Sequence, residues 1–211
     1  ALDHDEGLNT GGMGTVAPIP YYTPAVAERC MQEIFLPTVA AMQAEGCPFK
    51  GCLYFGLMLT PDGPKVIEYN CRFGDPETQV VLPLLESDLL TVMEATTNGT
   101  LDKTDVKFSD GAAACVILAS GGYPLAYEKG KEITGLTAGQ LDAADVTVYH
   151  AGTAIKDGSL VTNGGRVLGV TATANTLPEA LKKAYAATES IHFDKLHKRS
   201  DIGARALAAM Q

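Results

Sequence analysis

Basic residues are scarce in this chain of 211 residues. It contains 16 Lys and Arg against 25 Asp and Glu, so its formal net charge is -9 at pH 7. A surface of this sign repels phosphate backbones, which argues against a nucleic-acid-binding protein, although a pocket can still be locally positive. We therefore expect small molecules as partners and no nucleic acid.

Other absences narrow the class of protein further. The sequence has no long apolar run, no signal-peptide pattern, and no C-x-x-C pair among its five cysteines. Apolar residues make up 46% and charged residues 19%, which is typical of a packed globular protein rather than a disordered one. These features predict a cytoplasmic protein with reduced thiols and no membrane association.

A long helix and a hairpin are predicted in the first part of the chain. Apolar residues at helical spacing predict an amphipathic helix over residues 25–44, capped by Thr23 and with a possible break at Pro37. Two apolar runs, 52–60 and 65–70, flank an Asp-Gly turn. That arrangement is typical of an antiparallel hairpin.

Two shorter helices are predicted to follow the hairpin. Asp75 can cap a helix whose first position is Pro76 and which continues through 80–85. Ser87 begins the next helix, and residues after it, 98–105, are typical of a linker.

The rest of the chain is rich in β-strands. Three apolar segments, 111–120, 146–155 and 165–173, are separated by Gly and Asp turns. A helix then follows, opened by a capping box from Thr176 to Glu179.

We place a domain boundary near residue 105. Residues 1–105 combine helices with an antiparallel sheet, and residues 106–211 are predicted to form a small β-rich, barrel-like domain closed by a helix, so the fold class is α+β. The chain starts at Ala1 without an initiator Met and leads directly into a polar loop. We therefore expect a piece of a longer protein.

Polar residues alternate along the stretch VIEYNCRFGDPE. On an extended chain, Glu68, Asn70 and Arg72 would share one face. Carboxylate and amide oxygens without a nearby His or Cys suit a hard cation such as Mg²⁺, and an arginine fork suits a phosphoryl or carboxylate group. From the spacing alone, the row can also be the solvated face of a strand, and Asp75 a helix cap.

Four glycines fall within residues 7–14, in the sequence GLNTGGMG. This loop has neither the G-x-G-x-x-G arrangement after a strand nor the Lys of a Walker loop. It can be a flexible turn, or a loop whose unobstructed backbone N–H groups approach a substrate anion. The pattern leaves both interpretations open.

Seven short motifs follow one another along the chain: DEGLNTGGMGTVAPIP, LYFGLM, EYNCRFGDPETQ, GYP, YHAGT, TNGGRVL and RSDIG. In this order they resemble the phosphoribosylamine–glycine ligases, also called glycinamide ribonucleotide synthetases, a family of the ATP-grasp superfamily. The resemblance covers practically the whole chain. It implies that residues 1–105 are the second half of the ATP-grasp domain, that 106–211 are the C-terminal domain, and that an N-terminal domain and a first grasp lobe precede them.

The resemblance also implies an activity. ATP phosphorylates the carboxylate of glycine, and the amine of 5-phosphoribosylamine attacks the glycyl phosphate, giving glycinamide ribonucleotide, ADP and phosphate in purine biosynthesis. The implied cofactor is Mg²⁺ or Mn²⁺, the small-molecule partners are ATP, glycine and 5-phosphoribosylamine, and the implied state is a monomer. The 211 residues alone are expected to be inactive. Another ATP-grasp carboxylate–amine ligase, a carboxylase component and a non-catalytic binding module remain alternatives.

Carried over to this sequence, the resemblance assigns roles to individual residues. Glu68 and Asn70 match the metal ligands of the E-x-N motif. Arg72 would hold phosphoryl or acyl-phosphate oxygens, and Asp75 would receive the glycine amine. The implied substrate-side loop comprises Asn9, Thr10, Gly11, Gly12, Met13 and Gly14.

Two residues of the second part have open roles. Arg166 in TNGGRVL can pair with the ribose phosphate or be a structural arginine at a strand turn, and His150 in YHAGT can face the substrate or be a hydrogen-bonded residue of the barrel. The segment LYFGLM lacks an acidic residue that other ATP-grasp enzymes often have there, so the number of metal sites stays open. His197 stands where the family commonly has an aromatic residue.

Overall fold

The computed structural model describes residues 1–136 and 145–211, and the chain divides into two compact units. Unit 1 comprises Ala1–Pro18, Asp75–Leu84 and Ser109–Gln211, and unit 2 comprises Ile19–Gly74 and Leu85–Phe108. These units are interleaved along the chain because segments distant in sequence pack together. The predicted domains, 1–105 and 106–211, are each one continuous segment, whereas these compact units are not. The domain boundary near residue 105 stays a prediction.

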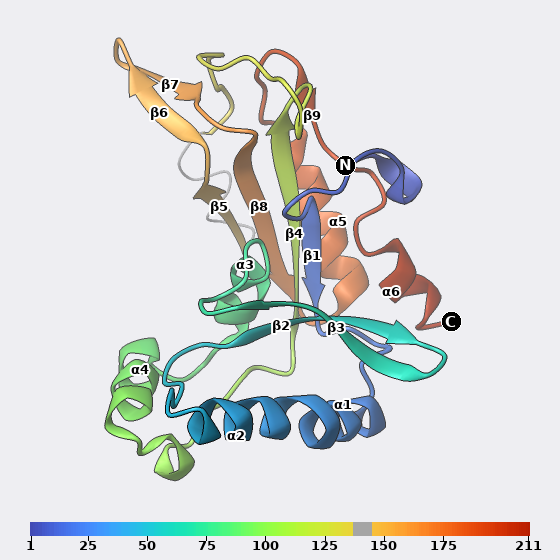
Figure 1. Cartoon of the computed structure of the whole chain (residues 1–211). Coiled ribbons are helices and arrows are strands. Elements are labelled where there is room, and N and C mark those ends of the chain that lie inside the picture. Colours follow the sequence, from blue (N-terminus) through green and yellow to red (C-terminus); the bar gives the residue numbers. More distant parts are fainter. Residues whose placement is uncertain (137–144) are drawn as a thin grey trace. The chain divides into compact units, whose positions relative to one another are not determined.

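An antiparallel sheet forms the centre of unit 1 (Figure 1). Its strands lie in the order β1 (Gly14–Ala17), β4 (Ala112–Ser120), β8 (Arg166–Ala174) and β5 (Val146–His150), with β9 (Leu196–His197) beside β4. Strands β4, β5 and β8 fall where the apolar segments predict them. Strands β1 and β9 are short edge pairings that the sequence analysis did not predict.

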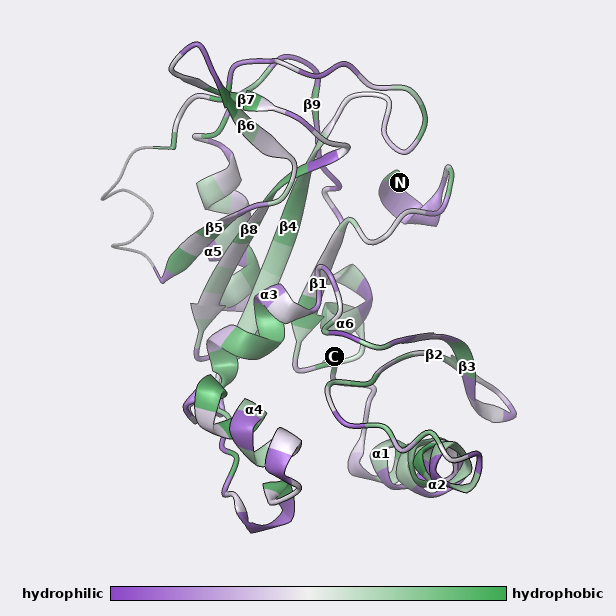
Figure 2. Cartoon of the chain, turned by 60° about the vertical axis from the view of Figure 1, so that its left-hand side comes forward, coloured by the Kyte–Doolittle hydropathy of each residue, from purple (hydrophilic) through white to green (hydrophobic). Residues whose placement is uncertain are grey.

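Strand β4 is buried over its whole length because both faces of the sheet are covered. Its residues from Ala112 to Leu118 alternate between two clusters. One face packs against α5 (Leu177–Thr188), and the other against the short helical segment formed by α3 (Thr78–Val81) and the 3₁₀ turn Leu82–Leu84. This explains why β4 is a continuous apolar run, which Figure 2 shows in green.

Even-numbered and odd-numbered residues of β4 therefore pack in two different hydrophobic clusters. Val116 and Leu118 pack in the cluster that contains Ala180 and Ala184 of α5. On the opposite face, Ala113, Cys115 and Ile117 pack with Val80 and Leu84. Full burial of one Val, Leu or Ile side chain contributes about 1.5–3 kcal/mol, so Val116, Ile117 and Leu118 of β4 each add to the stability of unit 1.

The segment predicted as one strand over 146–155 is interrupted. Strand β5 ends at His150, and a second strand, β6 (Thr153–Lys156), pairs with β7 (Ser159–Thr162) in a separate hairpin. The interruption lies at Gly152, where a Cβ atom would come within 2.6 Å of Gly164 Cα. The chain therefore turns between β5 and β6 at a close contact between two glycines.

Two predicted helix starts and one predicted capping box differ from the structure. Asp75 does not cap α3, which is preceded by Glu77. The next helix is α4 (Leu89–Asn98), and its cap is Asp88 rather than Ser87, because Asp88 Oδ1 accepts the Thr91 backbone N–H at 2.8 Å. Thr176 precedes α5 as predicted, but its side chain makes no capping hydrogen bond, so the predicted capping box does not form.

Unit 2 contains the predicted long helix in three consecutive parts. They are α1 (Pro24–Cys30), a π-helical turn (Met31–Phe35) and α2 (Leu36–Ala44). Thr23 caps α1, with its Oγ1 accepting the Val26 N–H at 3.3 Å. Pro37 does not break the helix: the turn before it widens, and the Leu36 N–H bonds to the Met31 carbonyl five residues back.

The predicted apolar face of this helix is buried only in its first half. Cys30 and Ile34 are buried, whereas Val39 and Met42 are exposed at 45% and 38%. The helical spacing of the apolar residues therefore predicts the helix correctly but not the extent of burial.

Among the described residues, no helix combines the length and apolar character that crossing a membrane requires.

The predicted hairpin is formed by β2 (Tyr54–Thr60) and β3 (Gly63–Asn70). Thr60 pairs with Gly63, so the turn consists of Pro61 and Asp62, and Gly63, predicted to lie in the turn, is the first residue of β3. The register shifts between Gly56 and Leu57, which is a β-bulge that changes the pairing before the end of β3.

Charged residues from both ends of the chain form an ion-pair cluster in unit 1. This terminal cluster comprises Asp5, Arg199, Asp201 and Arg205. Arg199 Nε donates to Asp201 Oδ1 at 2.7 Å, and Arg199 Nη2 lies 3.1 Å from Asp5 Oδ1. Hydrogen bonding from Arg199 holds the pKa of the Asp201 carboxyl well below its usual range. The RSDIG motif therefore joins the start of the chain to the segment before α6 (Ala204–Ala208).

We expect Asp201→Asn to destabilise unit 1 by about 1–3 kcal/mol at neutral pH, because it removes a charge-assisted partner of Arg199. The folded-state pKa of Asp201 is lowered, so its contribution is present above the unfolded pKa of about 4 and is lost as the pH falls below that value. Thermal unfolding should thus show a gap between wild type and Asp201→Asn that narrows from pH 7 to pH 3. Asp194→Asn is the control, because Asp194 pairs with Lys131 on the surface and should change little; a gap that is independent of pH would contradict this account.

Candidate functional site

Glu68 and Asn70 project from the same face at the end of β3, as strand alternation predicts. Asn70 Nδ2 donates to Glu68 Oε1 at 3.0 Å, which brings the two side chains into contact. Glu68 lies opposite Gly56 on β2. A Cβ atom at Gly56 would come within 2.8 Å of Glu68 Cγ, so a glycine opposite Glu68 makes room for its side chain.

Arg72 does not continue this row. Strand β3 ends at Asn70, and the chain bends before Arg72, whose Nη1 donates to the Phe73 carbonyl at 2.7 Å. Alternation along an extended strand therefore fails as a way to place Arg72. The guanidinium is on the surface of unit 2.

The donor set of Glu68 and Asn70 fits a hard divalent cation. A carboxylate and an amide supply oxygen ligands, and both are accessible at the end of the strand. In the part of the chain that the structure describes, no group of three or more His, Cys, Asp or Glu could enclose a metal. Two protein oxygens suit Mg²⁺ in particular, because this ion keeps several waters and binds substrate phosphates.

Arg166, at the start of β8, contacts two distant segments of unit 1. Its Nη1 donates to the Gly11 carbonyl at 3.0 Å and to the Asp75 carbonyl at 2.9 Å, with the Gly12 carbonyl at 3.4 Å. Its Nη2 donates to Asp75 Oδ2 at 3.0 Å. The Arg166 side chain is 19% exposed. We name this set, Gly11, Gly12, Asp75 and Arg166, the arginine clamp.

Asp75 presents an oriented carboxylate. Besides the bond from Arg166 to Oδ2, its Oδ1 accepts from Gln79 Nε2 at 3.0 Å, and the side chain remains 47% exposed. The carboxylate therefore accepts a hydrogen bond from an arginine 91 residues away and does not cap a helix N-terminus. Each oxygen retains acceptor capacity, so this group can receive a further cation or ammonium group.

The glycine loop continues directly into the sheet. Gly12 has φ +114° and packs on the ring of Pro76, where a Cβ atom would lie 2.5 Å from Pro76 Cδ. Met13 is buried, with its carbonyl accepting the Ile117 N–H at 3.0 Å, and Gly14 begins β1. The second half of the loop is thus part of the packed core, while Asn9 is exposed.

The remaining candidate, His150, ends β5. One of its ring nitrogens, Nδ1, lies 3.1 Å from Thr153 Oγ1, so it is hydrogen-bonded within its own turn. The side chain of Thr10 also bonds within its own loop: its Oγ1 accepts the Gly12 N–H at 3.2 Å.

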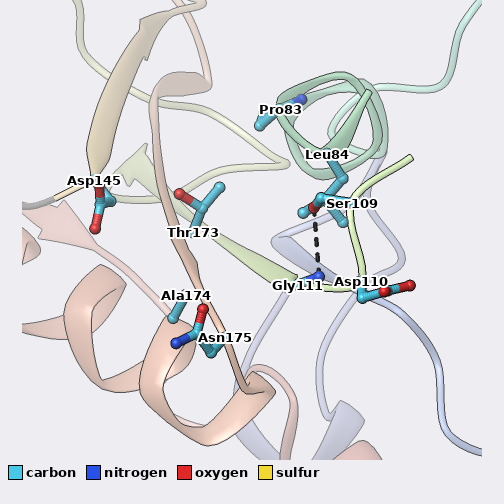
Figure 3. Close-up of a pocket in the computed structure, with 9 residues that line it drawn as sticks. All are labelled: Pro83, Leu84, Ser109, Asp110, Gly111, Asp145, Thr173, Ala174 and Asn175. Carbon is cyan, nitrogen blue, oxygen red and sulfur yellow. Dashed lines mark hydrogen bonds between the residues drawn. The ribbon is translucent and has the colours of Figure 1, made fainter. Parts of the chain in front are cut away.

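Unit 1 also contains a polar cavity of about 580 Å³ that none of the predicted residues line (Figure 3). It lies around Thr173, at the opposite end of β8 from Arg166. Its lining comprises Pro83, Leu84, Ser109, Asp110, Gly111, Asp145, Thr173, Ala174 and Asn175. Asp145 is paired with Lys183 at 2.9 Å, so one of the two acidic groups already has a cationic partner.

Two family models match the chain. Residues 1–78 match the model described as phosphoribosylglycinamide synthetase, ATP-grasp (A) domain, and residues 113–205 match the model described as phosphoribosylglycinamide synthetase, C domain. Both matched ranges include residues of the candidate site: Glu68 and Asp75 lie in the first, and Arg166 lies in the second.

Individual proteins agree with these matches. The chain is 50% identical over 210 residues to the phosphoribosylamine–glycine ligase of Vibrio vulnificus, which covers 99% of this chain and 48% of that protein. The crystal structure of phosphoribosylamine–glycine ligase from Thermotoga maritima matches with 41% identity and a TM-score of 0.83, over 95% of this chain and 49% of that one. The chain thus spans about half the length of the relatives it matches.

A more distant structure shows the fold alone. The biotin carboxylase domain of the Hydrogenobacter thermophilus 2-oxoglutarate carboxylase is 14% identical, with a TM-score of 0.58 over 94% of this chain and 42% of that one. The α+β architecture with antiparallel sheets therefore extends beyond sequences with recognisable similarity.

We expect Gly12→Ala to destabilise unit 1 by about 2–4 kcal/mol, because it adds a clash with Pro76 to an unfavourable backbone conformation. Gly130→Ala is a matched control: Gly130 also has a positive φ, but nothing lies within 4 Å of its Cβ position, so only about 1 kcal/mol should be lost. Denaturant unfolding of both variants measures the difference. Equal losses would show that contact with Pro76 does not constrain the loop.

Proposed function

The chain belongs to the phosphoribosylglycinamide synthetase family, and from this premise we propose that it takes part in the ATP-dependent ligation of glycine to 5-phosphoribosylamine. The carboxylate of glycine attacks the γ-phosphorus of ATP, which releases ADP and forms glycyl phosphate. The amine of 5-phosphoribosylamine then attacks the acyl carbon, loses a proton and displaces phosphate, giving glycinamide ribonucleotide for purine biosynthesis.

The oxygen pair of Glu68 and Asn70 is the observation that carries this proposal. In a chain with this similarity, the two side chains meet at 3.0 Å at the end of β3 and fit one hard cation, Mg²⁺ or Mn²⁺. When bound, such an ion would neutralise charge on the phosphate oxygens. Phosphoryl transfer depends mainly on positioning and charge neutralisation, so a ligand pair of this kind supplies what the step needs.

The other candidate residues have complementary roles in the proposal. Arg72, an exposed guanidinium, would hold phosphoryl or acyl-phosphate oxygens. Asp75, half exposed and oriented through both oxygens, would receive the glycine ammonium group. The loop from Asn9 to Gly14 would lie on the substrate side, with backbone donors near the substrate anions.

Three statements about the protein in its setting belong to the same proposal. It would act in the cytoplasm as a monomer, with small molecules as its partners and neither nucleic acid nor membrane. Because the chain spans about half the length of its relatives, we propose that turnover needs a protein of their full length. Titration of Mg-ATP into the 211 residues tests this point: tight binding would contradict it.

The activity itself is tested by following ADP release from ATP with glycine and 5-phosphoribosylamine. We expect release that depends on both substrates, together with formation of glycinamide ribonucleotide. Release without glycine dependence would favour another ATP-grasp ligase or a carboxylase component, and no release from a full-length protein would favour a binding module.

Glu68→Gln should lower turnover by about 10²-fold while leaving the fold intact, because a charged ligand to the phosphate-bound cation is lost. Steady-state kinetics over a range of Mg²⁺ concentrations, with circular dichroism as a check on folding, measure this. Glu94→Gln is the control, since Glu94 is exposed on α4 of the same unit. Normal activity and metal dependence in Glu68→Gln would refute the metal assignment.

A further inference from the structure

We propose that Arg166 is a positioning residue for glycine recognition and not the group that binds the ribose phosphate. The proposal rests on the proposed function, because it assigns Arg166 to the ligation reaction through Asp75. In this role the guanidinium fixes the Asp75 carboxylate and the main chain of Gly11 and Gly12 relative to each other.

The first argument is that most of the Arg166 guanidinium N–H groups already donate to acceptors within unit 1. Nη1 carries two protons, and it has carbonyl acceptors at 3.0 Å on Gly11 and at 2.9 Å on Asp75. Nη2 donates to the Asp75 carboxylate at 3.0 Å. Three of the five guanidinium N–H donors are thus bound to fixed acceptors, and the adjacent Asp75 carboxylate repels an approaching phosphate. Arg72 is exposed on unit 2, and within residues 1–136 and 145–211 its Nη1 donates only to the adjacent Phe73 carbonyl, so it is the better candidate for an anion.

The second argument is that three motif segments, GYP, YHAGT and TNGGRVL, meet at the residues just before Arg166. Ser120 binds the main chain there. Its backbone N–H donates to the Gly165 carbonyl and its Oγ donates to the Gly164 carbonyl, both at 2.8 Å. A Cβ atom at Gly165 would lie 2.1 Å from the Tyr123 ring, and one at Gly164 would lie 2.9 Å from Gly152 Cα. The glycines of these motifs are thus required by packing that fixes where β8 begins.

The third argument concerns Asp75. Arg166 holds Oδ2 and Gln79 holds Oδ1, so rotation of the carboxylate is restricted while nearly half of the side chain stays accessible. An ammonium group bound there would meet an acceptor already in place. Only a planar fork can reach the Asp75 carboxylate and the carbonyls of Asp75 and Gly11 at once; a lysine offers a single ammonium centre.

Arg166→Lys in the full-length protein tests the proposal. We expect the KM for glycine to rise about 10–100-fold, as for other residues that orient a binding group, with the KM values for ATP and 5-phosphoribosylamine within about twofold of wild type. Arg199→Lys is the matched control, because Arg199 is a similarly buried arginine, 16% exposed, that bridges Asp5 and Asp201 in the terminal cluster. It should lower the melting temperature without a change in the KM for glycine.

Hydrogen exchange gives a second readout that does not need turnover. In Arg166→Lys, and more strongly in Arg166→Ala, amides of residues 11–14 should exchange faster, because the clamp no longer holds the loop, whereas Arg199→Lys should leave them unchanged.

Two outcomes would overturn the proposal. One is a rise in the KM for 5-phosphoribosylamine without a rise for glycine, which would make Arg166 a phosphate ligand. The other is unchanged exchange at residues 11–14 in both Arg166 variants. Absence of glycine-dependent turnover in the wild type would instead count against the proposed function, and hydrogen exchange would still test the clamp.

Discussion

The burial of β4 on both faces is the constraint on which the rest of unit 1 depends. Because alternate residues of β4 face α5 and the α3 segment, neither layer can be displaced without exposing one of two apolar clusters. The C-terminal half of this strand also bonds to two other segments: the Ile117 N–H donates to the Met13 carbonyl, and Ser120 donates to the carbonyls of Gly164 and Gly165. The glycine loop and the segment before Arg166 are therefore both attached to one fixed strand.

Glycine is needed in unit 1 where pieces of chain approach too closely for a side chain. Gly12 packs on Pro76, Gly152 on Gly164, and Gly165 on the Tyr123 ring. These contacts bring together segments that are far apart in sequence, and each would be lost with a single Cβ atom. The glycine-rich character of NTGGMG and TNGGR thus follows from close packing around Arg166, whether or not a substrate also uses the exposed backbone.

Elements with local signals could be predicted from the sequence, and those that depend on distant partners could not. The hairpin with its two-residue turn, the Thr23 cap and the buried run of β4 are encoded within a few residues each. Strand β1 has only four residues, and it is a strand because it pairs with β4, a hundred residues later. The exposure of Val39 and Met42 likewise depends on what packs against the helix, which the spacing of apolar residues does not contain.

The candidate site shows the same division. Alternation on a strand correctly brings Glu68 and Asn70 together, but it does not reach Arg72, because β3 ends first. Asp75 next to a proline has the sequence of a helix cap, and its actual partner, Arg166, is invisible to any local rule. From the sequence, Arg166 can be a phosphate ligand or a structural arginine at a strand turn, and the two glycines directly before it are the local signal for a close approach of the backbone.

The scarcity of cations gives these assignments a common physical basis. The proposed reaction with ATP and a sugar phosphate would require several negative charges to be neutralised, and this chain carries a net charge of -9. The charge of Arg166 is paired with the Asp75 carboxylate, and its Nη1 donates to two carbonyls, so Arg166 contributes less to that neutralisation than an unpaired guanidinium would. In the proposed function, this charge would come from accessible groups such as Arg72 and from a divalent ion held by oxygen ligands. In the proposed function, orientation by an arginine and charge neutralisation by a metal are separate roles, and the acidic residues Glu68 and Asp75 would each bind a cation instead of repelling the anionic substrates.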